Sequence, residues 1–110
     1  MTTQDAPLAD LADQADQAAA VLKLLANEHR LLLLCRLARE EMSVGRLVTL
    51  CGSSQSGVSQ NLRRLREGGL VKTRRVRSTI YYSLADAEVR QLVETLCDRF
   101  GRPEKPRLSH

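Results

Sequence analysis

The stretch that decides the fold is residues 54–82, SQSGVSQNLRRLREGGLVKTRRVRSTIYY. Ser54 is a good N-cap residue for a helix, because its hydroxyl can accept a hydrogen bond from a free N–H of the first turn. Val58, Leu62 and Leu65 then recur at i, i+4 and i+7, which is the spacing of one buried helix face. The stretch therefore opens with an amphipathic helix.

A β-hairpin is predicted directly after this helix. Gly68-Gly69 ends the helix, because glycine accepts the left-handed conformation that closes helices. Residues 70–76 alternate in polarity, Arg77-Ser78 can turn, and residues 79–84 are rich in β-branched and aromatic side chains, as returning strands are.

Three further helices are predicted before this stretch and one after it. Leu11, Ala15, Ala18, Leu22 and Leu25 lie at helical spacing and give a first helix from Asp10 to about Ala26. A second helix opens at Glu28-His29 and is apolar nearly all round, so we expect it to be central. Ser43 caps a short third helix to Leu50, and Asp86 caps a last helix that reaches Phe100. The order helix–helix–helix–helix–strand–strand–helix predicts a mainly α winged helix-turn-helix fold with a small β-hairpin.

The chain has 110 residues, which suffices for one domain. We expect that domain to cover 9–100, between a flexible N-terminus, 1–8, and a disordered tail, 101–110. Only 3% of the residues are aromatic, so the core is aliphatic and small, which favours a homodimer. The acidic N-terminus lacks the basic region of a signal peptide and no apolar run could span a bilayer, so the expected location is cytoplasmic, with no membrane partner.

The charge of the chain is unevenly distributed. The first twenty residues carry four Asp and no base, whereas residues 60–80 carry seven bases against Glu67 alone. A basic block of this kind is an electrostatic footprint for a polyanion, although a basic run by itself can also be an ordinary solvated face.

The exposed face of the helix that follows Ser54 has the chemistry of major-groove recognition. Ser56, Gln60 and Arg63 lie opposite the buried face, and Gln can pair with adenine, Arg with guanine and Ser with either base. Arginines near the hairpin tip suit phosphates or a narrow minor groove. The predicted residues that contact double-stranded DNA are Ser54, Gln55, Ser56, Ser59, Gln60, Arg63, Arg64, Arg74, Arg75 and Arg77. Gly57 lies inside this helix at a cost of about 1 kcal/mol, which indicates close approach of either DNA or the preceding helix.

Five segments, at 25–31, 41–47, 54–62, 65–71 and 80–84, resemble the ArsR/SmtB family of winged-helix repressors. The similarity covers roughly residues 18–100 and is greatest to the metal-independent branch of nodulation, hemolysin and biofilm-growth regulators. It implies a homodimer joined by the first and last helices and bound to an imperfect palindrome. By position, Gln55, Ser56, Ser59 and Gln60 would face bases, and Arg63 and Arg64 phosphates. Asn61 stands where the family often has His. The implied dimer-interface residues are Leu11, Leu22, Val89, Leu92, Val93, Leu96 and Phe100.

Neither metal-sensing pattern of the family is present. The helix 43–50 lacks the paired cysteines, the last helix has no His, and the only histidines are His29 and His110. A closed zinc site needs four ligands in a tetrahedral array, so no metal and no cofactor are expected.

The resemblance makes Cys35 and Cys97 the candidate redox-sensing pair. The redox-responsive branch commonly has a cysteine at the position of Cys35, but its second cysteine corresponds to Gly101, one turn beyond Cys97. Pairing needs Cα atoms within about 7 Å. The three cysteines, Cys51 included, can equally be small buried hydrophobic residues.

Three alternatives stay open at this stage. The sequence has no catalytic triad, no phosphate loop and no paired carboxylates that would support an enzyme. A helical module that binds protein or nucleic acid non-specifically fits the basic face, but not the hairpin and the polar line on the helix. A repressor without any sensor fits everything except a role for the cysteines.

Overall fold

The computed structural model describes residues 5–100, with side chains for residue 12 and for 14–100. The predicted tail, 101–110, and the side chain of Leu11 lie outside the described residues. The elements are α1 (Asp5–Leu25), α2 (Glu28–Arg39), β1 (Met42–Ser43), α3 (Val44–Cys51), α4 (Gln55–Glu67), β2 (Val71–Val76), β3 (Thr79–Leu84) and α5 (Ala87–Phe100). Their order confirms the winged helix-turn-helix prediction.

Short polar side chains begin the helices, as the sequence predicted. Ser43 Oγ accepts from the N–H of Arg46 at 3.2 Å, and Ser54 Oγ from that of Gly57 at 3.1 Å. Asp86 Oδ1 accepts from the N–H of Val89 at 2.9 Å. Each bond satisfies one of the backbone donors that a first helical turn leaves unpaired.

The two-glycine stop of α4 is also confirmed. The N–H of Gly68 donates to the carbonyl oxygen of Arg64, and Gly69 has a φ of 80°, which an L side chain rarely adopts. The N–H of Leu70 then donates to the carbonyl oxygen of Leu65 at 2.9 Å, which closes the helix and turns the chain into β2.

A third strand, β1, was missed by the sequence analysis. Met42 and Ser43 pair antiparallel with Tyr82 and Tyr81, which gives a three-stranded sheet in the order β1-β3-β2. A two-residue strand has no periodicity of its own and is defined only by its partner. It ties the hairpin to the start of α3.

The core lies where α2, α3, α4 and the base of the sheet meet. Leu34, Leu37, Leu47, Leu62 and Leu65 are completely buried there. The burial of α2 confirms its predicted central position.

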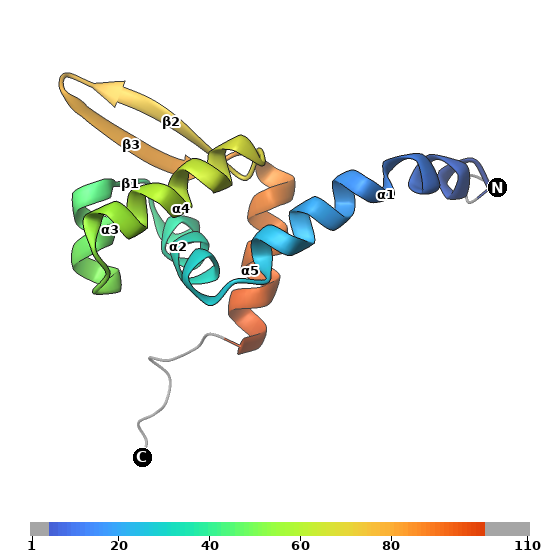
Figure 1. Ribbon diagram of the computed structural model, residues 1–110, viewed down its shortest axis with the longest axis horizontal. Helices are drawn as coiled ribbons and strands as arrows, with labels where there is room; N and C mark the ends of the chain where they lie inside the picture. Colours follow the sequence, from blue (N-terminus) through green and yellow to red (C-terminus); the bar gives the residue numbers. More distant parts are fainter. Residues whose placement is uncertain (1–4, 101–110) are drawn as a thin grey trace, which may run out of the picture.

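Helix α1 departs from the prediction in two ways. It begins at Asp5 rather than Asp10, since a proline such as Pro7 is tolerated in a first helical turn. It also projects away from the rest of the molecule (Figure 1), and Ala15, Ala18 and Leu22 of its amphipathic pattern are exposed in the protomer. Among the described side chains of α1, those that pack on the core lie in its last turns, at Val21, Leu24 and Leu25.

The predicted dimer-interface residues on α5 fall into two groups. Leu92 and Phe100 are exposed, and Val89 and Leu96 are half-buried. Val93 is only 1% exposed and packs in the core of its own protomer. A part of Val93 in the dimer interface stays a prediction, since its side chain is buried where α5 packs against α2 and β3 of the same protomer.

Candidate nucleic-acid interface

The helix-turn-helix is formed by α3, the turn at residues 52–54 and α4. Gly52 has a φ of 68° and its N–H donates to the carbonyl oxygen of Val48 at 3.0 Å, which ends α3 and redirects the chain. Val58, Leu62 and Leu65 anchor α4 on the core, as predicted. Their burial turns the opposite face of α4 to solvent.

The seven predicted DNA-contact residues at the N-cap and on α4 are all exposed: Ser54, Gln55, Ser56, Ser59, Gln60, Arg63 and Arg64. They belong to the start and the exposed side of α4, and α4 runs next to the hairpin (Figure 1). Short hydroxyl and amide groups lie toward the start of the helix and the two arginines toward its end. A groove-binding helix needs this arrangement, because base edges are read near its N-terminus.

Gly57 is explained by its own helix cap. A Cβ at this position would lie 3.1 Å from the Ser54 hydroxyl that caps α4. No atom of the preceding helix lies within 4 Å of that Cβ, so close approach of the preceding helix does not account for the glycine. A larger residue would crowd the cap that fixes the start of α4.

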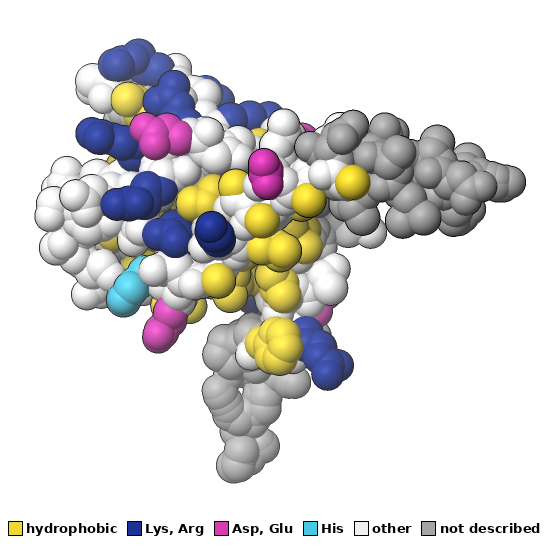
Figure 2. Space-filling model, turned by 45° about the vertical axis from the view of Figure 1, so that its right-hand side comes forward, with side chains coloured by type: hydrophobic (Ala, Val, Ile, Leu, Met, Phe, Trp, Pro, Cys, Tyr) yellow, Lys and Arg dark blue, Asp and Glu magenta, His cyan; other side chains and the backbone are white. Residues whose placement is uncertain are grey.

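Basic side chains dominate the surface over the hairpin and α4 (Figure 2). Arg75 and Arg77 are exposed, and among the described residues their side chains form no hydrogen bond or ion pair. Arg77 lies in the turn with a φ of 58°, in the left-handed region that disfavours side chains with a Cβ. Both guanidinium groups are available to an anion.

Arg74 differs from its neighbours, because it is already bound to a carboxylate. Its Nε and Nη2 donate to the two carboxylate oxygens of Glu41, each at 2.8 Å. Its Cζ lies 5.6 Å from the ring centroid of Tyr81, within cation–π range. The hydrogen bonds from Arg74 lower the pKa of the Glu41 carboxyl, with burial acting in the opposite direction. Sequence reasoning missed Glu41, since it lies 33 positions from Arg74.

Asn61 has a structural partner. Its Oδ1 accepts a 3.4 Å hydrogen bond from Nη1 of Arg30, whose Nε donates to the carbonyl oxygen of Leu24 at 2.9 Å. The side chain of Asn61 therefore connects α4 to the junction of α1 and α2, and it is turned away from the exposed face.

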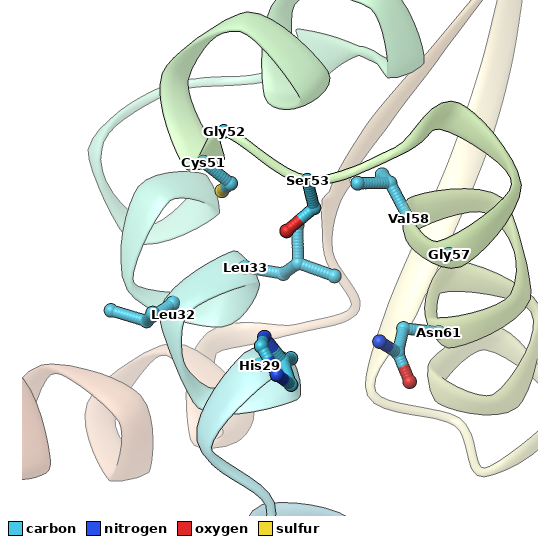
Figure 3. Close-up of a pocket in the computed structure, with 9 residues that line it drawn as sticks. All are labelled: His29, Leu32, Leu33, Cys51, Gly52, Ser53, Gly57, Val58 and Asn61. Carbon is cyan, nitrogen blue, oxygen red and sulfur yellow. The ribbon is translucent and has the colours of Figure 1, made fainter.

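A hollow of about 410 Å³ lies behind α4, between the start of α2 and the turn of the helix-turn-helix. The side chains of His29, Ser53 and Asn61 border it, together with Cys51, Leu32 and Val58 (Figure 3). Among these lining residues there is no carboxylate, and the one imidazole has no acid partner there. The hollow does not supply an acid–base pair.

Cys35 of α2 and Cys97 of α5 form a disulfide. Their Cα atoms are 6.1 Å apart, within the range that a disulfide requires. The predicted pair is thus brought together, because α5 packs along α2 with Cys97 opposite Cys35. Both residues line a second, mainly apolar hollow of about 360 Å³, with Leu32, Leu96 and Phe100. Cys51 is a free, half-buried thiol.

Among the described residues, no three His, Cys, Asp or Glu side chains gather into a group that could hold a metal ion. Within the same part of the chain, no helix is long and apolar enough to cross a membrane.

The model of a helix-turn-helix domain matches residues 25–74. The chain is 42% identical over 89 residues to the transcriptional activator HlyU of Vibrio cholerae, and the match covers 81% of this chain and 82% of that protein.

Solved structures agree with this relationship. The transcriptional repressor BigR from Xylella fastidiosa superimposes with a TM-score of 0.78 at 41% identity, covering 88% of this chain and 96% of that one. A winged helix-turn-helix DNA-binding domain from Mycobacterium bovis, described as homodimeric, gives a TM-score of 0.71 at 35% identity, covering 87% and 92%.

Proposed function

Because this chain belongs to the ArsR/SmtB family of winged-helix transcriptional regulators, in the metal-independent branch, we propose that it binds an imperfect DNA palindrome as a homodimer. One observation carries the proposal: the exposed polar line of α4 lies beside the basic hairpin on one surface of the molecule. As a DNA-binding regulator it is not an enzyme, and we place its action in the cytoplasm, where the operator lies.

Each part of the surface has its own role in this proposal. Gln55, Ser56, Ser59 and Gln60 face base edges in the major groove, and Ser54 holds the start of the helix with its backbone donors toward a phosphate. Arg63 and Arg64 neutralise phosphates beside the groove. Arg75 and Arg77 neutralise phosphates from the wing, which is the hairpin formed by β2 and β3 and follows the DNA backbone.

The test compares binding to the promoter region of the protein's own gene with binding to random DNA, in the presence of competitor. Gln60→Ala should weaken operator binding by about tenfold, since a good base contact contributes about 1–3 kcal/mol of discrimination, and should leave random-DNA binding unchanged. Arg63→Gln should weaken both. Arg36→Gln is the matched control, because it removes an exposed charge outside this surface. Equal binding of the wild type to both DNAs would contradict sequence-specific recognition.

We further propose that the Cys35–Cys97 pair controls DNA binding. With hydrogen peroxide, the O–O bond breaks as the two thiols give up two electrons and two protons, and the S–S bond and two water molecules form. With a polysulfide, S–S bonds of the polysulfide break: one sulfur atom is inserted between the two cysteine sulfurs, and a second takes the two electrons and two protons and leaves as hydrogen sulfide. The bond joins α2, which packs against α4, to α5, which the family resemblance implies at the dimer interface. Oxidation would therefore change the position of α4 relative to the dimer interface, and this change would alter the affinity for DNA.

A Cys35→Ser, Cys97→Ser double variant should bind operator DNA equally with and without oxidant, while the wild type loses affinity on oxidation. Cys51→Ser is the matched control and should respond like the wild type. Equal release of wild type and double variant would show that the disulfide is structural only. Zinc at micromolar concentration should leave all of these affinities unchanged, because we propose no metal-sensing role.

A further inference from the structure

The ion pair between Glu41 and Arg74 crosses the whole sheet. Glu41 immediately precedes β1, Arg74 lies on β2, and β3 runs between the two strands. Tyr81 of β3 is the cross-strand partner of both Ser43 and Arg74, so its ring lies on the face that the ion pair spans. The pair thus fastens the wing to the start of α3.

The geometry makes Arg74 a poor candidate for a phosphate contact. One edge of its guanidinium, Nε and Nη2, donates to a single carboxylate whose negative charge offsets that of Arg74, and Tyr81 lies within cation–π distance. A phosphate that approached the remaining Nη1 would come close to the Glu41 carboxylate, which repels it. Arg74 is the main cause of the lowered pKa of the Glu41 carboxyl, and the charge of Lys72 lowers that pKa to a smaller extent.

We propose that Glu41 is a positioning residue that determines specificity by withholding Arg74 from the DNA backbone. This rests on the proposed DNA interface and deepens it: the wing neutralises phosphates with Arg75 and Arg77, and Arg74 orients it. Non-specific affinity comes almost entirely from phosphate contacts. If the wing makes one phosphate contact fewer, the base contacts of α4 contribute a larger fraction of the binding free energy.

The number of neutralised phosphates is measurable. The logarithm of the binding constant falls with the logarithm of salt concentration by about 0.9 for each phosphate neutralised on duplex DNA. Releasing Arg74 should therefore steepen the slope by about 0.9, which is roughly a 3.5-fold larger loss of affinity for a fourfold rise in salt. A purely structural role for the ion pair would leave the slope unchanged.

The experiment measures this slope by fluorescence anisotropy with operator and random duplexes. We expect Arg75→Gln to lower the slope by about 0.9 and Arg74→Gln to leave it within error of the wild type. Glu41→Gln should steepen it and raise random-DNA affinity more than operator affinity. The double variant Glu41→Gln, Arg74→Gln should lose that increase, because the released charge is gone. Should Arg74→Gln not fold, Arg74→Met keeps the aliphatic stem over Tyr81 and serves in its place.

Several results would overturn the proposal, an unchanged slope in Glu41→Gln among them. A slope lowered equally by Arg74→Gln and Arg75→Gln would place Arg74 on a phosphate. A steepened slope that persists in the double variant would show that Glu41 acts only through its own charge. If Arg75→Gln and Arg77→Gln both leave the slope unchanged, the wing does not contact DNA. That result also removes the wing from the proposed interface, whereas the contribution of α4 is read separately from Arg63→Gln.

Discussion

Arg30 of α2 connects three helices through the hydrogen bonds of its guanidinium. Its Nε and Nη2 donate to the carbonyl oxygens of Leu24 and Lys23 at the end of α1, and its Nη1 donates to Asn61 on α4. The last carbonyls of a helix have no partner within it, so a cation from the next helix takes up acceptors that would otherwise need water. The guanidinium of Arg30 therefore connects the backbone of α1 to α4.

This arrangement predicts unequal effects of two substitutions. Arg30→Met should lower the free energy of unfolding by about 2 kcal/mol, since it removes charged donors from half-buried acceptors. Asn61→Ala should cost about 1 kcal/mol or less, because only one 3.4 Å hydrogen bond is lost. Urea unfolding followed by circular dichroism measures both. The prediction would be wrong if Arg30→Met cost no more than the exposed-surface control Arg36→Met.

Glu41 gives a prediction about pH. Its carboxyl has a pKa below the ordinary 4.5, because Arg74 donates hydrogen bonds to the ionised form. A lowered folded-state pKa means that the ion pair contributes its full stability above pH 4.5 and loses it as the pH falls through the lowered value. Wild type should therefore be more stable than Glu41→Gln at neutral pH, and the difference should shrink as the pH falls from 4.5 through the lowered pKa of Glu41. Thermal unfolding of both proteins across this range checks it, and a constant difference would contradict the assignment.

At the scale of elements, local signals decided which predictions held. The starts of α3, α4 and α5 and the end of α4 were correct because caps and glycines act within four residues. Three features were not predictable from such signals: the pairing of β1 with β3, the Glu41–Arg74 ion pair and the burial of Val93. Each depends on a partner distant in sequence. The family resemblance indicated Cys35 and Cys97 as a candidate pair. That the two residues lie close enough to bond became evident only from the packing of α5 on α2.

The turn of the wing combines backbone strain with a proposed phosphate contact, and one pair of substitutions separates them. Arg77 has a φ of 58°, where a residue with a Cβ costs roughly 1–2 kcal/mol. Arg77→Gly should leave stability equal or slightly higher, yet lower the salt slope of DNA binding by about 0.9. Arg77→Val should lower the slope equally and also destabilise the protein by about 1 kcal/mol or more, since branched side chains fit this conformation worst. Equal stability of the two variants would show that the turn relaxes freely.

At the scale of the whole molecule, the protomer leaves an apolar surface uncovered. Leu22 of α1 is 63% exposed and Phe100 of α5 is 79% exposed. Hydrophobic side chains cluster to the right of centre in Figure 2, beside the Lys and Arg side chains on the left of the same view. A single α4 helix can contact only one half-site of a palindrome. The distance between the α4 helices of two protomers must therefore be set by a contact between the protomers outside α4. This apolar surface is where we place that contact, with α1 extending from one protomer toward its partner.

Leu22→Glu tests that placement. Burying a leucine contributes about 2 kcal/mol, and a two-fold interface contains the residue twice, so the dimer should weaken on the order of 1000-fold. Sedimentation equilibrium should show monomers where the wild type is dimeric, and Leu22→Met, which keeps the apolar contact, should remain dimeric. Operator affinity should fall to that of a single half-site. The far-UV spectrum and the affinity per site for random DNA should stay close to wild type, because Leu22 is exposed and is not one of the proposed DNA-contact residues. If Leu22→Glu stayed fully dimeric, α1 would not form the interface, and the spacing of the two reading helices would have to be set by α5 alone.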